Sequence, residues 1–176
     1  MTRSQALGLW VLTIALMAIG AGQKWGDYSV SADAGGGSII VNGFGVFPVI
    51  GTLIGLQVIC ILLSLLVRPV FVRVMSGLLV PIMVWNLVDV VLNAVSKVEQ
   101  SVGQLLAEQT GVIQDISGSD FVIAGTSSSL SLVYVLAVGF NIGVLGLVTA
   151  VPLRQRVNKD SKKAPELPED LWSDQK

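Results

Sequence analysis

Four apolar segments of nearly bilayer length dominate this 176-residue chain. They cover residues 6–22, 46–67, 74–92 and 130–151. A helix rises about 1.5 Å per residue, so about 20 residues cross the roughly 30 Å hydrocarbon core of a bilayer. Hydrophobic residues make up 52% of the chain and charged residues only 13%. The sequence therefore predicts an all-α fold, a four-helix transmembrane bundle.

The rest of the chain divides into two loops and a tail. Residues 23–45 and 93–129 are the loops, and the membrane domain is expected to end at residue 152. Within the first loop, Ser38–Val41 is β-prone and is followed by a turn signal, which predicts a small extended strand or a hairpin there. Residues 153–176 are rich in Pro, Lys, Glu and Asp, which predicts a disordered tail. The first span has some features of a signal peptide, but we expect it to be retained as an anchor.

The basic residues indicate the orientation in the membrane. Of the eleven Lys and Arg residues, only Lys24 and Lys97 lie on the side that holds the two loops. Because cytoplasmic segments carry the Lys and Arg excess, both termini are predicted to be cytoplasmic. The chain is thus expected to be a multi-pass protein of the plasma membrane, with the third helix extended on the outer side.

Composition argues against several function classes. A net charge of −1 is unsuited to binding nucleic acid, which requires an excess of cations. The absence of histidine removes the commonest metal ligand and the commonest general base. The single cysteine, Cys60, lies inside the second span and is expected to be inert. We expect no enzymatic activity, no metal and no cofactor, and no small-molecule substrate is evident.

Polar residues inside the spans are costly in lipid, so they are the candidate functional residues. Asn86 and Asp89 lie on one face of the third helix, and Asp89 is the only acid inside an apolar segment. Asp89 is either a proton or cation site, or it reaches the outer interface or bonds to Asn86 and a neighbouring helix. Gln57 and Asn141 are neutral amides, which we expect to form hydrogen bonds between helices.

Small and aromatic residues predict how the spans are packed and placed. Gly51 with Gly55, and Gly139 with Gly143, form two G-x-x-x-G motifs, in which small residues let helices approach closely. These four glycines are the candidate helix-packing residues. Trp25 and Tyr28 follow the first span and are predicted to anchor it in the headgroup layer.

An apolar stripe continues beyond the third span. Its residues recur at intervals of three or four, which predicts that the helix extends to about Ile116. The stripe packs either on the membrane surface or first loop, or on another chain. The candidates for facing a partner are Val95, Val98, Val102, Leu105, Val112 and Ile116.

Several features together resemble a known group of proteins. They are Trp25 after the first span, the pair Phe47-Pro48, the turn Arg68 to Arg73, the long segment before the last span, and Asp170-Leu171-Trp172. The chain resembles small actinobacterial four-span proteins of the tryptophan-biosynthesis-associated membrane protein family. That family has no assigned chemistry, so the resemblance implies a fold and no catalytic residue. The chain also looks like the accessory subunits, without cofactors, of actinobacterial respiratory (cytochrome bcc-aa3) supercomplexes.

From these features we expect a non-catalytic accessory or assembly subunit of a larger integral membrane complex, with a respiratory supercomplex as the leading case. The expected partners are other integral membrane subunits and lipids. Two alternatives remain open: a small transporter or channel component that uses Asp89, and a lipid-interacting membrane regulator that acts through its tail.

Overall fold

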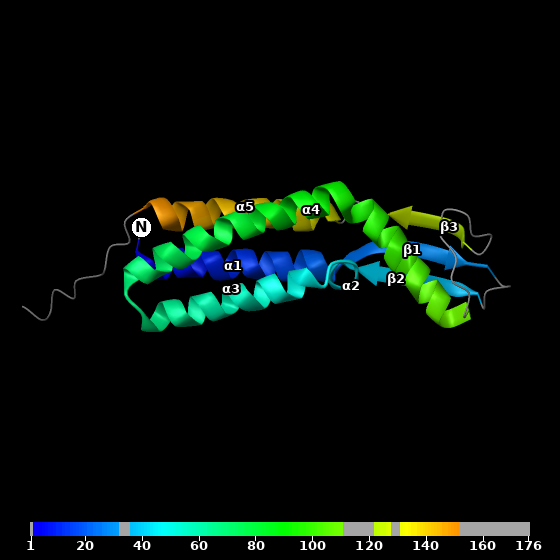
Figure 1. Ribbon diagram of the computed structural model, residues 1–176, viewed down its shortest axis with the longest axis horizontal. Helices are drawn as coiled ribbons and strands as arrows, with labels where there is room; N and C mark the ends of the chain where they lie inside the picture. The colour runs from blue at the N-terminus through cyan, green and yellow to red at the C-terminus, as the bar shows by residue number, and fades with distance from the viewer. Residues whose placement is uncertain (1, 32–35, 111–121, 128–130, 152–176) are drawn as a thin grey trace, which may run out of the picture.

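The chain folds into a bundle of long helices with a small sheet at one end (Figure 1). The computed structural model describes residues 2–31, 36–110, 122–127 and 131–151. In chain order the elements are α1 (Arg3–Gly22), β1 (Lys24–Val30), β2 (Gly37–Asn42), α2 (Gly43–Val46), α3 (Val49–Leu66), α4 (Pro69–Thr110), β3 (Val122–Ser127) and α5 (Ser131–Ala150).

Four of these helices are long and apolar enough to cross a membrane. The segments that meet these criteria are Arg3–Gly22, Val49–Leu66, Val70–Glu108 and Leu132–Ala150. They lie side by side, and the start of α1, the α3–α4 connection and the end of α5 share one end of the bundle (Figure 1). We call this the turn end and the opposite end the sheet end. The four predicted spans are thus confirmed as helices, and the chain is a multi-pass membrane protein by length and composition.

The helices are not packed equally. α5 packs along both α1 and α4, whereas α3 makes fewer contacts with α1 and α4. α1 approaches α5 closely at Gly20, where an added Cβ would lie 2.9 Å from the Cα and backbone nitrogen of Tyr134. Only glycine fits there without moving a helix. Outward-facing side chains such as Leu66 and Trp85 are 85% and 76% exposed, as a lipid environment allows.

A three-stranded antiparallel sheet caps the bundle. Its strand order is β2-β1-β3, and Tyr28 at its centre is opposite Ile39 on one side and Gly125 on the other. The register shifts between Lys24 and Gly26. The strand predicted at Ser38–Val41 is confirmed as part of β2, but β1 and β3 were not predicted. The all-α prediction is therefore corrected: the fold is mostly helical with a small sheet.

The part of α4 nearest the sheet end crosses the sheet (Figure 1). Val98 and Val102 on this part are 3% and 0% exposed. A Cβ added to Gly26 of β1 would lie 2.9 Å from Val98 Cγ1, so helix and strand are in close contact. α4 therefore continues well past the predicted span, as expected. The described part ends at Thr110, so the predicted continuation to Ile116 and the tail at 153–176 lie outside the described residues.

Candidate functional site

A buried polar cluster lies inside the bundle and is centred on Gln57 of α3, which is fully buried. Its Oε1 accepts hydrogen bonds from Trp10 Nε1 of α1 at 2.9 Å and from Asn141 Nδ2 of α5 at 3.0 Å. Its Nε2 donates to Met83 Sδ of α4 at 3.4 Å. One glutamine side chain therefore touches all three other spanning helices.

Asn141 extends this cluster toward α1. Its Nδ2 donates to Thr13 Oγ1 at 2.7 Å, and the Thr13 hydroxyl in turn donates to the Trp10 carbonyl at 2.8 Å. These are the hydrogen bonds between helices that the sequence predicts for Gln57 and Asn141. Each such bond in a membrane contributes about 0.6 kcal/mol on average. No side chain in the cluster is ionisable, so its chemistry suits holding helices in register better than moving protons.

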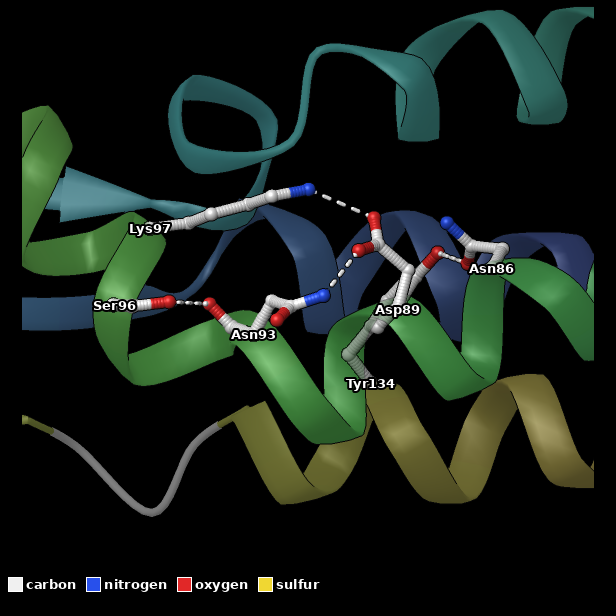
Figure 2. Close-up of polar contacts among 6 residues, drawn as sticks. All are labelled: Asn86, Asp89, Asn93, Ser96, Lys97 and Tyr134. Atoms are coloured by element: carbon white, nitrogen blue, oxygen red, sulfur yellow. Dashed lines mark hydrogen bonds and ion pairs between the residues drawn. The ribbon is translucent and has the colours of Figure 1, made fainter.

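A second buried contact joins α4 to α5 nearer the sheet end. The Tyr134 hydroxyl donates to Asn86 Oδ1 at 2.8 Å (Figure 2). Asn86 and Tyr134 are 2% and 0% exposed. Asn86 Nδ2 has no hydrogen-bond partner among the described residues. Asn86 therefore bonds to a neighbouring helix. The alternative in which Asp89 bonds to Asn86 and a neighbouring helix is not seen, since Asp89 pairs with Asn93 and Lys97 of its own helix.

The ion pair of Asp89 belongs to a single helix. Asp89 Oδ2 lies 2.8 Å from Lys97 Nζ, and its Oδ1 accepts from Asn93 Nδ2 at 2.7 Å (Figure 2). The Asp89 and Lys97 side chains are 25% and 37% exposed. Lys97 Nζ also lies 4.3 Å from the centroid of the Phe47 ring, within cation–π range. The carboxylate of Asp89 thus faces a cation of its own helix at a partly exposed position.

Sequence reasoning missed Lys97 as the partner of Asp89. Lys97 stands eight residues further along the same helix, and two turns of about 3.6 residues bring it near the face of Asp89. The side chain is long enough to reach back along the helix. The spacing was therefore a usable signal, but Lys97 had been assigned to an outer loop.

Trp25 and Tyr28 are not exposed anchors at the headgroup layer, which corrects that prediction. They are 1% and 7% exposed. The Trp25 ring packs against Phe47 and Tyr134, with centroids 5.8 Å and 5.5 Å apart, and its Nε1 donates to the Gly20 carbonyl at 3.0 Å. Burial raises the pKa of Tyr28, and the Glu99 carboxylate adds to this effect. The cause is the sheet, because β1 folds under α4 and its aromatic rings complete the core.

Among the described residues, the glycines of the two G-x-x-x-G motifs make no close contact between helices. A Cβ added to Gly55, Gly139 or Gly143 meets nothing within 4 Å. One added to Gly51 meets only the Phe44 ring, at 3.9 Å. All four glycines are exposed on the outward faces of α3 and α5. Their predicted role in packing is therefore not one within the described part of the chain.

The apolar stripe on the part of α4 nearest the sheet end has both buried and exposed residues. Val98 and Val102 are buried, so the contact with the first loop accounts for them and they are not free to face a partner. Val95 and Leu105 are 60% and 37% exposed. Leu105 borders a pocket of about 210 Å³ between β2 and α4. Buried positions along this part of α4 fall at 90, 98, 102 and 106, at intervals of four or eight residues, whereas the predicted stripe alternates between four and three. Val112 and Ile116 lie outside the described residues.

No candidate metal centre emerges from this geometry. Within the described ranges, no group of three or more Cys, Asp or Glu side chains is placed to hold a metal ion. No family model matches the chain, and no curated protein or solved structure matches it. The resemblance to the actinobacterial four-span family therefore stays a prediction.

Proposed function

We propose that this protein is a non-catalytic accessory or assembly subunit of a larger integral membrane complex. The observation that carries the proposal is the outward position of the two glycine pairs, Gly51 with Gly55 and Gly139 with Gly143. A glycine inside a helix costs about 1 kcal/mol relative to alanine in water. Among the described residues, no close packing at these glycines offsets that cost. Close packing by a helix of another subunit against these faces would offset it.

The proposal also includes an orientation in the membrane, which we infer from the distribution of Lys and Arg residues. Arg3, Arg68 and Arg73 belong to the turn end, whereas Lys24 and Lys97 belong to the sheet end. We place the turn end and both termini in the cytoplasm and the sheet outside the plasma membrane. The sheet and the outer part of α4 then form a small extracytoplasmic head. A respiratory supercomplex is the specific assembly we propose, from the resemblance to its accessory subunits.

The test is co-purification after gentle extraction. The tagged chain is extracted from its native membranes in a mild detergent, and the accompanying chains are identified by mass spectrometry. We expect integral membrane subunits in a fixed ratio to this chain, and cytochrome absorbance if the complex is respiratory. Elution as a lone 18.5 kDa chain would contradict the proposal.

Variants locate the contact on the glycine faces. The double replacement Gly51→Leu with Gly55→Leu fills the outward face of α3 and should reduce recovery of partners about tenfold or more, since it adds bulk where helices would approach closely. The matched control is Val58→Leu with Ile59→Leu, because these residues are 42% and 55% exposed and already bulky. Equal partner recovery from both double variants would remove α3 from the proposed interface.

The structure gives less support to the two alternatives. A transporter that uses Asp89 would need a carboxylate free to bind its ion, but Asp89 is paired with Lys97 and Asn93. If Asp89→Asn abolished a proton- or cation-coupled flux, the transporter would nonetheless replace our proposal. A lipid-interacting regulator would act through residues 153–176, which lie outside the described residues.

A further inference from the structure

The fold gathers cations at the turn end. Arg3 lies in the first turn of α1, Arg68 lies in the α3–α4 connection, and Arg73 lies one turn into α4. Arg3 Nη2 donates to the Val67 carbonyl at 2.9 Å, across 64 residues of sequence. This bond places the Arg3 guanidinium directly beside the Arg68 backbone. Arg3, whose Nε is buried without a hydrogen-bond partner among the described residues, and the exposed Arg68 are therefore neighbours at the turn end.

The described part of the chain provides no counter-charge at this end. Its acids are Asp27, Asp89, Glu99 and Glu108, all in β1 or in the half of α4 toward the sheet. The two ion pairs found among described residues, Lys24 with Asp27 and Lys97 with Asp89, both lie there too. Because like charges placed together are unfavourable, a cluster without a counter-ion among the described residues favours an added anion.

Two helix N-termini add to the positive potential. α1 begins at Arg3 and α4 begins at Pro69, and neither helix has an acid in its first turn. The Arg3–Val67 bond holds these two helix starts next to each other. The N-terminus of a long helix carries a partial positive charge, which favours phosphate and carboxylate groups. The helix ends and the arginines therefore act in the same direction.

Exposed aliphatic side chains next to Arg68 in sequence favour a phospholipid over a free phosphate ion. Leu65, Leu66 and Val70 are 60%, 85% and 66% exposed, and they flank Arg68 in sequence. A free phosphate ion would gain nothing from them. A phospholipid would place its acyl chains on them while its phosphate met the guanidinium groups, which bind phosphate through paired N–H donors.

We propose that the turn end, through Arg3, Arg68 and Arg73 and the N-termini of α1 and α4, binds the headgroup of an anionic phospholipid. This lipid site is independent of the proposed assembly role: the protein would bind the lipid in this way whether or not it is a subunit of a larger complex.

The experiment measures lipid binding to the purified full-length protein. The protein is stripped of lipid in detergent and titrated with phosphatidylglycerol, with phosphatidylcholine and with inorganic phosphate, and bound molecules are counted by native mass spectrometry. We expect phosphatidylglycerol to bind at least tenfold more tightly than phosphatidylcholine, while inorganic phosphate neither binds measurably nor competes. A basic residue at a membrane surface contributes about 1 kcal/mol, so Arg68→Gln should weaken phosphatidylglycerol binding about fivefold. Arg73→Gln should weaken it in the same direction.

The control removes one positive charge at the sheet end of the bundle instead of the turn end. Lys24→Gln also removes one cation from an exposed position, and it should leave phosphatidylglycerol binding unchanged. Equal weakening by Lys24→Gln and Arg68→Gln would overturn the site. So would equal affinity for the two lipids, or displacement of phosphatidylglycerol by inorganic phosphate. Phosphatidylglycerol binding that appears only after removal of residues 158–176 would show that the acidic tail occupies the arginines, and it would also overturn the proposal.

Discussion

The α1–α5 interface and the outward face of α3 both carry glycine, but only the first uses it for close packing. At Gly20, an added Cβ would lie 2.9 Å from the backbone of Tyr134. At Gly55, an added Cβ would meet nothing within 4 Å. Gly20 belongs to no pair that the sequence analysis singled out, whereas Gly55 belongs to a well-known motif. The motif therefore indicates a surface that permits close approach and does not indicate which surface is used within the chain.

The largest expected effect tests the tight interface. Gly20→Ala places a methyl group against the Tyr134 backbone, which cannot move aside as a side chain could. The helices must separate, and overpacking of this kind costs about 1–3 kcal/mol. The measurement is the free energy of unfolding in mixed micelles, followed by circular dichroism.

The matched control for this prediction lies on the same helix. Gly8 has nothing within 4 Å of an added Cβ, so Gly8→Ala should cost nothing. If both alanine variants were equally stable, the close contact between α1 and α5 would be contradicted, and with it the contrast between the two glycine faces.

The next effect tests what the buried amides add to this packing. Gln57→Leu removes the acceptor shared by Trp10 Nε1 and Asn141 Nδ2 and leaves donors buried among apolar groups. Leaving buried donors without an acceptor costs about 1–2 kcal/mol. The free energy of unfolding should fall by this amount, whereas Gln100→Leu, at an exposed position of α4, should leave it nearly unchanged. Equal effects of the two replacements would show that the central hydrogen bonds contribute little.

The spans could be predicted because their signal is local. Each is a run of apolar residues whose length alone matches a bilayer. The sheet could not be predicted to the same degree, because its strands pair across long sequence distances and its burial depends on α4 crossing it. Trp25 illustrates the point: beside a span it resembles an interface anchor, and only the fold of β1 under α4 shows that it is core.

For the buried polar contacts, the sequence indicated the amide residues but not their hydrogen-bond partners. Gln57 and Asn141 stand out as amides inside apolar segments, so their importance is visible in the sequence. Their partners Trp10 and Thr13 do not stand out, since an indole and a hydroxyl are ordinary in such segments. Tyr134 was missed for the same reason. A buried amide requires a donor or acceptor on a neighbouring helix, and that requirement was the available signal.

A smaller effect tests the second buried contact. Tyr134→Phe removes the hydroxyl that donates to Asn86 Oδ1 and leaves the ring packed against Trp25. Combined with Asn86→Leu in a double-mutant cycle, it should give a coupling of about 0.6 kcal/mol, the average for such bonds in membranes. A coupling near zero would mean that this hydrogen bond contributes little to holding α4 against α5, which are also joined by the hydrogen bond between the Ser76 and Thr149 hydroxyls at 2.9 Å.

The smallest loss of stability is expected at Gly55. Gly55→Ala meets open space, so the free energy of unfolding of the isolated chain should not fall, and it should rise by up to about 1 kcal/mol, the cost of glycine inside a helix. Recovery of partner subunits should nevertheless fall, because the added methyl group stands on the face that we propose for another helix. A loss of stability as large as that of Gly20→Ala would show that a part of this chain outside the described residues already covers Gly55. The outward glycines would then complete the fold of one chain, and the case for a partner on α3 would be lost.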